Sequence, residues 1–428
     1  MLKIYRMELR RSPILIAMPA LIALDIAVLF GRSRHWIGVW PEASAAAQVV
    51  TLFLGPALAA VSAWQAGRAS RSGMPEFLQA AARPVWAIEA VRLAATLTLG
   101  YIAYGIGCLV AAALSLPDAG PGFLWPSYVL LGVSTLTAYA AVGHIVGRAW
   151  PSAAFTPVVC ALGGFVAFMT VGQIYGLFVL SGAPGMQLQP LPVTLRLLFA
   201  LSLVGLAVLL PRPSRSMKGV SRRTLPARTR LAVTSFAALA FVLAASIPVA
   251  GEVRVQRQAS SVTPLCRSAS DASPRVCVWP EHRKYLPELT NMARRLSEIP
   301  DSWIRTPDTF YEYGLRPTDL GDPGFEIMEG HVRSAAIAMG MQTKDESLGV
   351  CIPPRDAPRA RQAVNNISMW FEYRAMGQDP ETADAGLTIS GAPGSQRAAG
   401  EASVMSESDQ RSWTSTERAH LKKWCRSR

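Results

Sequence analysis

The chain has 428 residues, half of them hydrophobic, and its formal net charge at pH 7 is +13. So apolar a composition, with a mean hydropathy of +0.25, argues against an ordinary soluble protein. The basic excess is confined to residues 1–250, which carry 19 Lys and Arg against 6 Asp and Glu, whereas residues 251–428 carry 23 of each. An apolar, basic first part and a neutral, more polar second part predict a membrane domain followed by a water-exposed domain.

Seven apolar runs in the first part approach the roughly 20 residues that cross a bilayer. Most of them contain Pro or Gly, which membrane helices carry more often than soluble helices do. The sequence therefore predicts an α-helical polytopic membrane protein with about seven transmembrane helices. The expected spans are 13–31, 45–66, 88–116, 127–147, 153–180, 195–210 and 231–250.

Basic residues mark one set of the loops between these spans. Sixteen Lys and Arg fall before the first span, in the alternate loops or, in the case of Arg92, near the start of the third span, and only Arg32 and Arg34 fall in the short loops of the opposite set. Since basic loops stay on the cytoplasmic side, we expect a multi-pass protein of the cell membrane with a cytoplasmic N-terminus and an extracytoplasmic C-terminal domain. The stretch 211–230, which has seven bases and no acid, then becomes a cytoplasmic loop. Nucleic-acid binding is not expected there, because no aromatic residue interleaves the bases.

The second part reads as a polar tether over 251–262 and a small α+β domain over 263–428. Four cysteines lie in this domain, and an even number in an extracytoplasmic setting predicts disulfides. Four cysteines allow three pairings; the spacing favours Cys266 with Cys277, closing a short loop, and Cys351 with Cys425, tying back the terminus. The chain has no CxxC motif, so a structural zinc site is not expected.

Periodicity within this domain predicts strands near 275–280 and 347–354 and helices over 285–299 and 357–377, with a further helix within 324–341. Residues 377–411, rich in Gly, Ala and Ser, read as a long mobile loop. The last helix is expected over 414–424, with Thr414 and Glu417 forming a capping box. The histidines are scattered and neither a GxSxG motif nor a P-loop occurs, so we expect no catalysis, no metal and no cofactor.

Two features inside the predicted spans are candidate functional or packing sites. Asp25 lies within the first span, and an intramembrane carboxylate is costly, so a pair with Arg196 is one expectation and a protonated or interfacial Asp25 is the other. The spacings Gly143–Gly147 and Gly172–Gly176 are typical of closely packed helices. Packing within the chain and a dimer face are both compatible with them.

The loop between the second and third spans carries an apolar face on a short stretch that begins like a helix. Ser72 can cap it, Pro75 suits its first turn, and Phe77 and Leu78 lie beside Glu76. A short amphipathic helix on the cytoplasmic surface is predicted, and Pro75 to Leu78 are the candidate docking residues for a partner.

A basic amphipathic start ("MLKIYRMELRRSP"), six following spans and this structured loop together resemble the permease subunit of an ABC exporter of the ABC-2 type. The stretch "VCVWPEHRKYLPEL" is similar to actinobacterial permease-like proteins that continue into an extracytoplasmic domain. The resemblance implies a separate ABC ATPase subunit and a homo- or heterodimeric assembly in the lipid bilayer. The seventh span and the outer domain depart from the simple pattern. A membrane-anchored extracytoplasmic ligand-binding, sensor or immunity-type accessory protein without transport activity is therefore the alternative.

The predicted orientation is testable with reporter fusions after Arg148, Arg230 and Arg428. Because basic loops stay inside, we expect cytoplasmic signals from the first two fusions and an extracytoplasmic signal from the third. A cytoplasmic signal at Arg428 would contradict both the orientation and the setting assumed for the disulfides.

Overall fold

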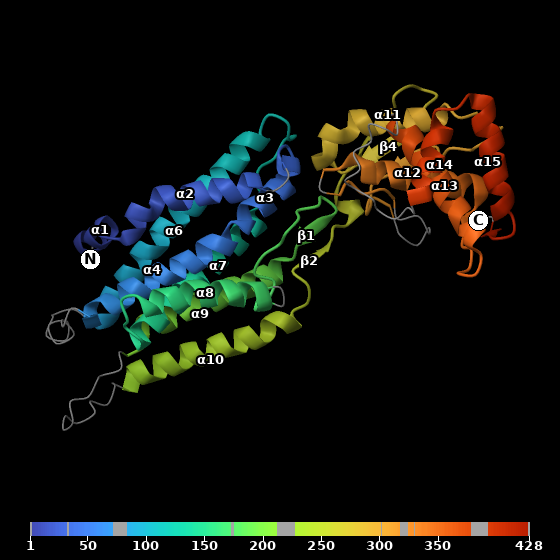
Figure 1. Ribbon diagram of the computed structural model, residues 1–428. Coiled ribbons are helices and arrows are strands. Elements are labelled where there is room, and N and C mark those ends of the chain that lie inside the picture. The colour runs from blue at the N-terminus through green and yellow to red at the C-terminus, as the bar shows by residue number, and fades with distance from the viewer. Residues whose placement is uncertain are drawn as a thin grey trace. The chain divides into compact units, whose positions relative to one another are not determined.

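A computed structural model describes residues 2–31, 34–71, 84–172, 175–211, 227–300, 302–316, 324–328, 330–377 and 393–426. The chain forms two compact units, Met1–Val255 and Gln256–Arg428, each with its own hydrophobic core (Figure 1). We call them the N-terminal unit and the C-terminal unit. The boundary falls in β2 (Arg254–Gln256), so the expected tether 251–262 contains a strand, which pairs with β1 (Met186–Leu188), and a short 3-10 helix, η2 (Ala259–Ser261).

The N-terminal unit is a bundle of apolar helices. Its described elements are α1 (Leu2–Arg10), α2 (Pro13–Gly31), η1 (Arg34–Trp36), α3 (Trp40–Val49), α4 (Thr51–Arg71), α6 (Val85–Ser115), α7 (Pro126–Ala149), α8 (Phe155–Val171), α9 (Pro190–Leu209) and α10 (Ala227–Val249). Within the described ranges, six segments are long and apolar enough to cross a membrane, with α3 and α4 forming one of them over Trp40–Arg68.

The difference between six and the expected seven spans lies in α8. We expected a span over 153–180, but the helix covers only Phe155–Val171, or 17 residues. At 1.5 Å per residue that is about 25 Å, short of the roughly 30 Å hydrocarbon core. The count of seven is therefore not confirmed, and the chain beyond Val171 is non-helical up to β1 where it is described.

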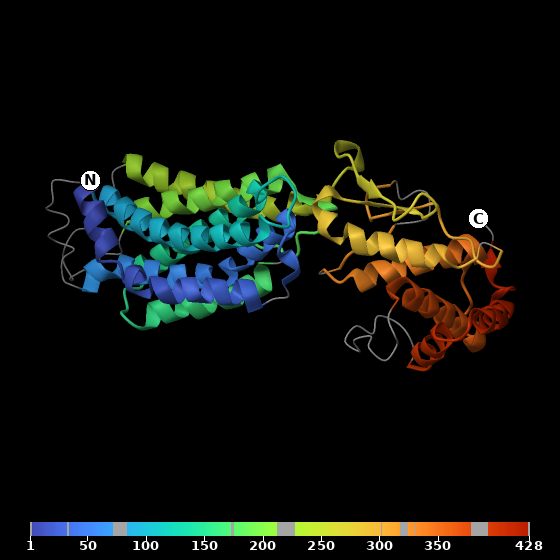
Figure 2. The ribbon, with the colours of Figure 1, turned by 90° about the horizontal axis from the view of Figure 1, so that it is seen from above.

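The helices of this unit lie side by side (Figure 2), and α4 contacts α2, α6, α7 and α8. It packs mainly against α7 and α8, while α7 also packs against α9 and α9 against α10. α1 lies at one end of the bundle and β1 at the other (Figure 1). We call these the α1 end and the β1 end. α2 packs chiefly against α6 and is otherwise largely exposed.

The predicted close packing at Gly143 and Gly147 is confirmed. A Cβ atom at either position of α7 would lie 2.1 Å from a backbone oxygen of α4, that of Ala59 or Ala63. Glycine therefore lets the two backbones touch. The second predicted pair is wrong as a helix-packing motif: α8 ends at Val171, and Gly176 has a φ of +54°, outside any helix.

The C-terminal unit combines small sheets with helices, as expected for an α+β fold. β3 (Leu265–Arg267) pairs antiparallel with β4 (Arg275–Val278), which pairs parallel with β5 (Thr309–Tyr311), and β6 (Val350–Cys351) pairs antiparallel with β7 (Cys425–Arg426). The helical elements are η3 (Pro280–Tyr285), α11 (Leu286–Ser297), α12 (Val332–Leu348), α13 (Pro358–Met376), α14 (Pro393–Ser403) and α15 (Glu407–Leu421).

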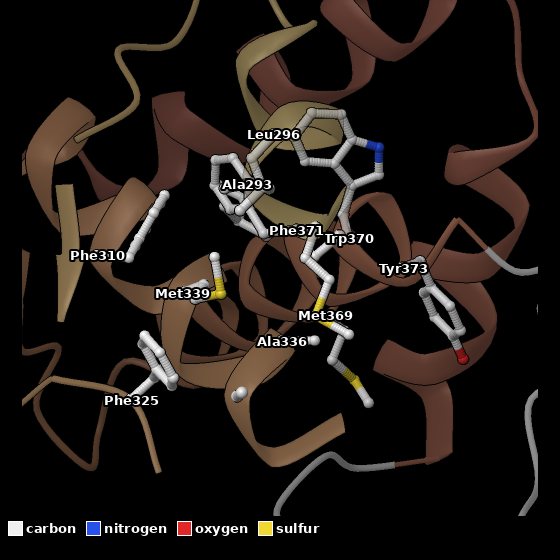
Figure 3. Packing of buried hydrophobic residues seen from close by; sticks show 14 of the residues in the cluster. Ala293, Leu296, Phe310, Phe325, Ala336, Met339, Met369, Trp370, Phe371 and Tyr373 are labelled. Atoms are coloured by element: carbon white, nitrogen blue, oxygen red, sulfur yellow. The ribbon is translucent and has the colours of Figure 1, made fainter. Parts of the chain in front are cut away.

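The core of this unit forms between α11, α12, α13 and the three-stranded sheet. The expected apolar face of α11 is buried, including Leu289 and Leu296. Trp370 and Phe371 of α13 are also buried and lie near Met339 of α12, as Figure 3 shows. Burial of this core supplies a hydrophobic driving force that belongs to the unit itself.

Two expectations for the end of the chain are wrong. The segment 377–411 is not one long loop, because α14 and the first turn of α15 lie within it; residues 378–392 are outside the described ranges. α15 begins at Glu407, and its N-cap is Ser406, whose hydroxyl accepts from the Asp409 amide. Thr414 therefore lies inside the helix, where its hydroxyl donates to the Gln410 carbonyl and accepts from the Trp303 indole.

Both predicted disulfides are confirmed. Cys266 bonds to Cys277 and Cys351 to Cys425. Each bond joins residues that lie directly opposite each other on antiparallel strands, β3–β4 and β6–β7. The second bond closes a separation of 74 residues, so it fastens the C-terminus to β6 and restricts the unfolded chain strongly.

The close contact between Gly143 and α4 predicts that a single added methyl group destabilises the bundle. We expect Gly143→Ala to lower the stability of the full chain in detergent by about 2 kcal/mol, because α7 must move away from the Ala59 carbonyl. Gly105→Ala in α6 is the matched control, since a Cβ there meets nothing within 4 Å. Thermal unfolding compares the two variants, and a Gly143→Ala protein as stable as the control would contradict the packing argument.

Candidate functional site

The buried polar groups of the N-terminal unit gather in three places: the non-helical segment after α8, the middle of α2, and the α1 end. Each place has its own chemistry. A polar group without a partner in an apolar setting costs free energy, so the partners show what each group does.

The non-helical segment Tyr175–Gly182 is held by side chains from other helices. Gln48 of α3 donates to the Leu177 carbonyl at 3.1 Å and accepts from the Val179 amide at 3.0 Å. Thr135 of α7 donates to the same Leu177 carbonyl at 3.0 Å. These contacts replace hydrogen bonds that a continuing helix would have made, which is the condition for irregular backbone inside a membrane bundle.

Toward the β1 end, Glu42 also binds the non-helical segment, and its carboxylate acts as the hydrogen-bond acceptor. Its carboxylate accepts from the Gly182 amide at 3.0 Å and from the Ser181 hydroxyl at 3.1 Å. His35 of η1 lies 3.5 Å from the same carboxylate. Gly182 packs so closely that a Cβ there would lie 2.0 Å from the Pro41 carbonyl oxygen. The segment is therefore bound along its length by α3.

The predicted pair of Asp25 with Arg196 does not form. Arg196 of α9 is buried and donates to three backbone carbonyls, those of Tyr175, Gly176 and Pro192, at 2.7 to 3.0 Å. A guanidinium has five N–H donors, and free carbonyls at the break after α8 can accept them. Arg196 is therefore a structural clamp on the non-helical segment, and its charge is not used to neutralise Asp25.

Asp25 is 1% exposed, and neither carboxyl oxygen has a hydrogen-bond partner among the described residues. The carboxyl lies against α6 at Gly107, where a Cβ would be 2.3 Å from Oδ2. Tyr104 and Cys108 of α6 are its electrostatic neighbours. The side chain is buried within the bundle, and the alternative expectation of a protonated or interfacial Asp25 stays a prediction.

At the α1 end, a first set of hydrogen bonds joins α2, α4 and α6. Ser12 caps α2 by accepting from the Ile14 amide, and its hydroxyl also accepts from the Gln65 amide group at 2.8 Å. The Gln65 carbonyl oxygen accepts from Thr96 of α6 at 2.9 Å. All three side chains are buried, so the bonds are shielded from water.

A second set at this end joins α1, α6 and α7. Glu89 and Arg92 of α6 are 3.3 Å apart, Arg92 reaches Glu8 of α1 at 3.5 Å, and Glu89 lies 3.0 Å from His144 of α7. Glu89 and His144 are at most 1% exposed. Glu89, Arg92 and Thr96 share one face of α6 at i, i+3 and i+7. We call these side chains and the first set together the α1-end network.

Arg148 ties the end of α9 to the same region. Its guanidinium donates to the carbonyls of Ala207, at 2.7 Å, and of Leu210 at the end of α9. The last carbonyls of a helix lack partners within it and carry a partial negative charge, which a cation satisfies. The basic residue that predicted orientation thus also caps a helix.

In the C-terminal unit, His282 and Glu312 form a buried pair with 2.6 Å between Nδ1 and Oε1. The other oxygen of Glu312 accepts from the Trp279 amide. The pair fastens η3 to the residue after β5, and no nucleophilic side chain is hydrogen-bonded to it in the described part of the chain. Nor does any cluster of three His, Cys, Asp or Glu there suit a metal ion.

An open pocket of about 340 Å³ lies at the start of α13. Arg359 and His420 bring basic side chains to it, and Trp424 brings an aromatic ring. The remaining lining residues are Ala357, Pro358 and Ala360.

The charged pair Arg333–Glu372 joins α12 to α13. Burial raises the pKa of Glu372 above its ordinary value, and the neighbouring Arg333 guanidinium offsets only part of that rise. The folded unit therefore binds a proton at Glu372 more tightly than the unfolded chain does. Its contribution to stability is largest in acid and is lost as the pH rises through the raised pKa.

Sequence reasoning found Asp25, Arg196 and the cysteines but missed the partners of the polar residues. The signal that could have located them is the presence of Gln48, Gln65 and Glu89 in apolar runs, because each such group needs a partner. The predicted docking residues Pro75, Glu76, Phe77 and Leu78 lie outside the described residues, as does most of the basic stretch, 212–226.

No family model, curated protein or solved structure matches the chain. The proposed function is therefore inferred from the side-chain contacts alone.

The Arg333–Glu372 pair predicts a pH-dependent stability effect. Arg333→Met should destabilise the C-terminal unit by about 2 kcal/mol at neutral pH, because it leaves a buried carboxylate without its cation. The loss should shrink as the pH falls, since protonation removes the unpaired charge. Hydrogen exchange of α12 and α13 in the full chain measures it at several pH values. Arg333→Met with Glu372→Gln is the control, and a loss in Arg333→Met that is the same at acid and neutral pH would contradict the assignment.

Proposed function

We propose that the chain is the permease-like membrane subunit of an ABC-type exporter and works with a separate ATPase. The observation that carries the proposal is the α1-end network. It joins four helices of the bundle, α1, α2, α4 and α6, and reaches α7 through His144. An externally driven membrane subunit needs such a connection, because force applied at one loop must move several helices together.

The position of the network favours this role. The segment 72–83 connects α4 to α6, and each of these helices contributes a network residue near its junction with that segment, Gln65 and Glu89. A partner docked on Phe77 and Leu78 would thus act on two helices that are already fastened together. Buried, fully paired polar groups are rigid, and rigidity suits transmission of a displacement.

Two further observations support the proposed orientation. Both disulfides lie in the C-terminal unit, and the two free cysteines, Cys108 and Cys160, lie in the N-terminal unit. Disulfides persist in oxidising compartments, so an extracytoplasmic C-terminal unit accounts for this distribution. The α1 end, where the basic loops emerge, is then cytoplasmic, and the β1 end lies outside.

A second candidate function is a membrane-anchored extracytoplasmic binding protein, either a sensor or an immunity-type accessory. The pocket at the start of α13 favours it, because Arg359, His420 and Trp424 would suit a ligand with an anionic group and a flat apolar part. Under this alternative the N-terminal unit only anchors and signals. The two candidates differ in whether a nucleotide-hydrolysing partner is required.

Co-purification tests the proposed ATPase. We expect the full chain, purified from cells that express it natively, to retain an ABC ATPase in a fixed ratio. Phe77→Asp with Leu78→Asp should abolish that association while membrane insertion is unchanged, because neither residue lies in a span. Arg222→Gln with Arg223→Gln is the matched control in the other basic loop and should retain the partner.

A third variant separates docking from coupling. Gln65→Leu with Thr96→Val removes both partners of a network hydrogen bond, so the ATPase should still bind but its turnover should lose its dependence on the membrane subunit. If the unmodified chain retains no ATPase, or if the Phe77 and Leu78 variant retains it fully, the anchored binding protein is the better account.

A further inference from the structure

Asp25 is a buried carboxylic acid of the N-terminal unit, and both of its oxygens lack a hydrogen-bond partner among the described residues. Only three residues of α2 are buried, Ile14, Asp25 and Leu29, while most of this helix faces outward. A carboxyl group is therefore one of the three buried side chains of α2, beside the apolar residues that pack against the bundle core. It makes no hydrogen bond among the described residues, and this burial would be costly for an ionised group.

A glycine of α6 leaves space for the carboxyl group of Asp25. Gly107 of α6 lies directly beneath it, and any side chain there would overlap Oδ1 and Oδ2. Tyr104, one turn earlier on α6, is also buried, its hydroxyl lies beside the Cys108 thiol, and it is seated on Gly132 of α7 in the same way. Two buried polar groups thus lie close to each other, each seated on a glycine.

Among the described residues, no cation from the elements packed against α2 contacts the Asp25 carboxyl. η1 packs on the end of α2 through Trp36 and carries Arg34 and His35, but His35 lies against Glu42. On α6 the titratable neighbours are Tyr104 and Cys108, whereas Glu89 and Arg92 belong to the α1-end network. α3 contributes only Glu42, which binds Gly182 and Ser181, and the arginines of α4, Arg68 and Arg71, lie in its last turn. Tyr104 and Cys108 are neutral in their protonated forms, so they bring no positive charge to balance an ionised carboxylate.

We propose that Asp25 is a proton-binding site: its carboxyl group is neutral while α2 lies against α6, and loss of the proton separates the two helices at this level. A metal ion does not fit the same place, because one carboxylate and one phenol supply too few oxygens and the carboxyl is pressed against backbone. A proton needs no additional ligands. It converts an uncompensated buried charge into a neutral group that α2 and α6 can enclose.

The separation follows from the cost of the charged state. An ionised Asp25 needs hydrogen-bond donors or a cation, but the carboxyl is buried against Gly107 and no described side chain supplies either. Only three residues of α2 are buried and its other core contacts are partly buried, so a movement of α2 can expose the charge to solvent. This site is independent of the proposed ATPase partner, and its test requires no partner.

Infrared spectroscopy of the full chain in lipid nanodiscs measures the proton directly. We expect the C=O band of a protonated carboxyl at neutral pH, absent from Asp25→Asn and lost as wild type is titrated from about pH 5 to about pH 10. Asp118→Asn is the matched control, since Asp118 is exposed, and it should keep the band. An ionised Asp25 at neutral pH, shown by no difference between wild type and Asp25→Asn, would overturn the proposal.

Cys108 reports the separation of the helices. It is buried beside Asp25, and in a Cys160→Ala background it is the only free thiol, because the other four cysteines are disulfide-bonded. We expect a water-soluble thiol reagent to modify it at least roughly tenfold faster in wild type than in Asp25→Asn once Asp25 is ionised, and equally in both at acid pH. Comparing the two proteins at each pH cancels the ionisation of the thiol itself.

The two measurements have separate outcomes. A band that titrates with a constant ratio of labelling rates would overturn helix separation. An Asp25→Asn protein that cannot be assembled would overturn the neutral resident state, because asparagine is the uncharged isostere. Asp25→Leu is a second uncharged variant. If it also assembles and its Cys108 thiol is modified slowly at all pH values, the opening depends on the charge of Asp25, as proposed.

Discussion

Backbone groups that leave a helix inside an apolar bundle need new partners, and this constraint shapes the N-terminal unit. α8 ends at Val171, and the chain that follows presents carbonyls and amides where lipid could not accept them. Gln48, Thr135 and Arg196 converge on Tyr175 to Val179 from three different helices. The packing of α3, α7 and α9 is therefore organised around one broken segment.

The two ends of the bundle satisfy polar groups in different ways. At the β1 end, side chains bind backbone, as Glu42 and Arg196 do. At the α1 end, side chains mainly bind one another, in the chain Glu8, Arg92, Glu89, His144. Side chain–backbone bonds fix a local fold, whereas side chain–side chain bonds fix the positions of whole helices. The proposed mechanical role therefore belongs to the α1 end, where the bonds hold whole helices together.

Most of the fold could be predicted from the sequence, but the hydrogen-bond partners of its buried polar groups could not. Apolar length located six segments that can span a membrane, and cysteine spacing identified both disulfides, because each signal depends on nearby residues alone. The end of α8 could not be predicted, since "VGQIYGLFVL" stays apolar and only distant donors such as Gln48 let it unwind. The start of α15 was missed because the Ser406 cap is polar and flanked by polar residues.

The failed pairing of Asp25 with Arg196 follows from an asymmetry of helices. Each backbone carbonyl has a second lone pair to offer, whereas each N–H within a helix is already used. A buried cation can therefore be satisfied by backbone alone, as Arg196 is by three carbonyls. A buried carboxylate needs donors. Glu42 obtains one where the chain is non-helical, at Gly182, and Glu89 obtains Arg92 and His144, but Asp25 faces the unbroken helix α6. A proton is the one partner that such a site can bind without rebuilding either helix.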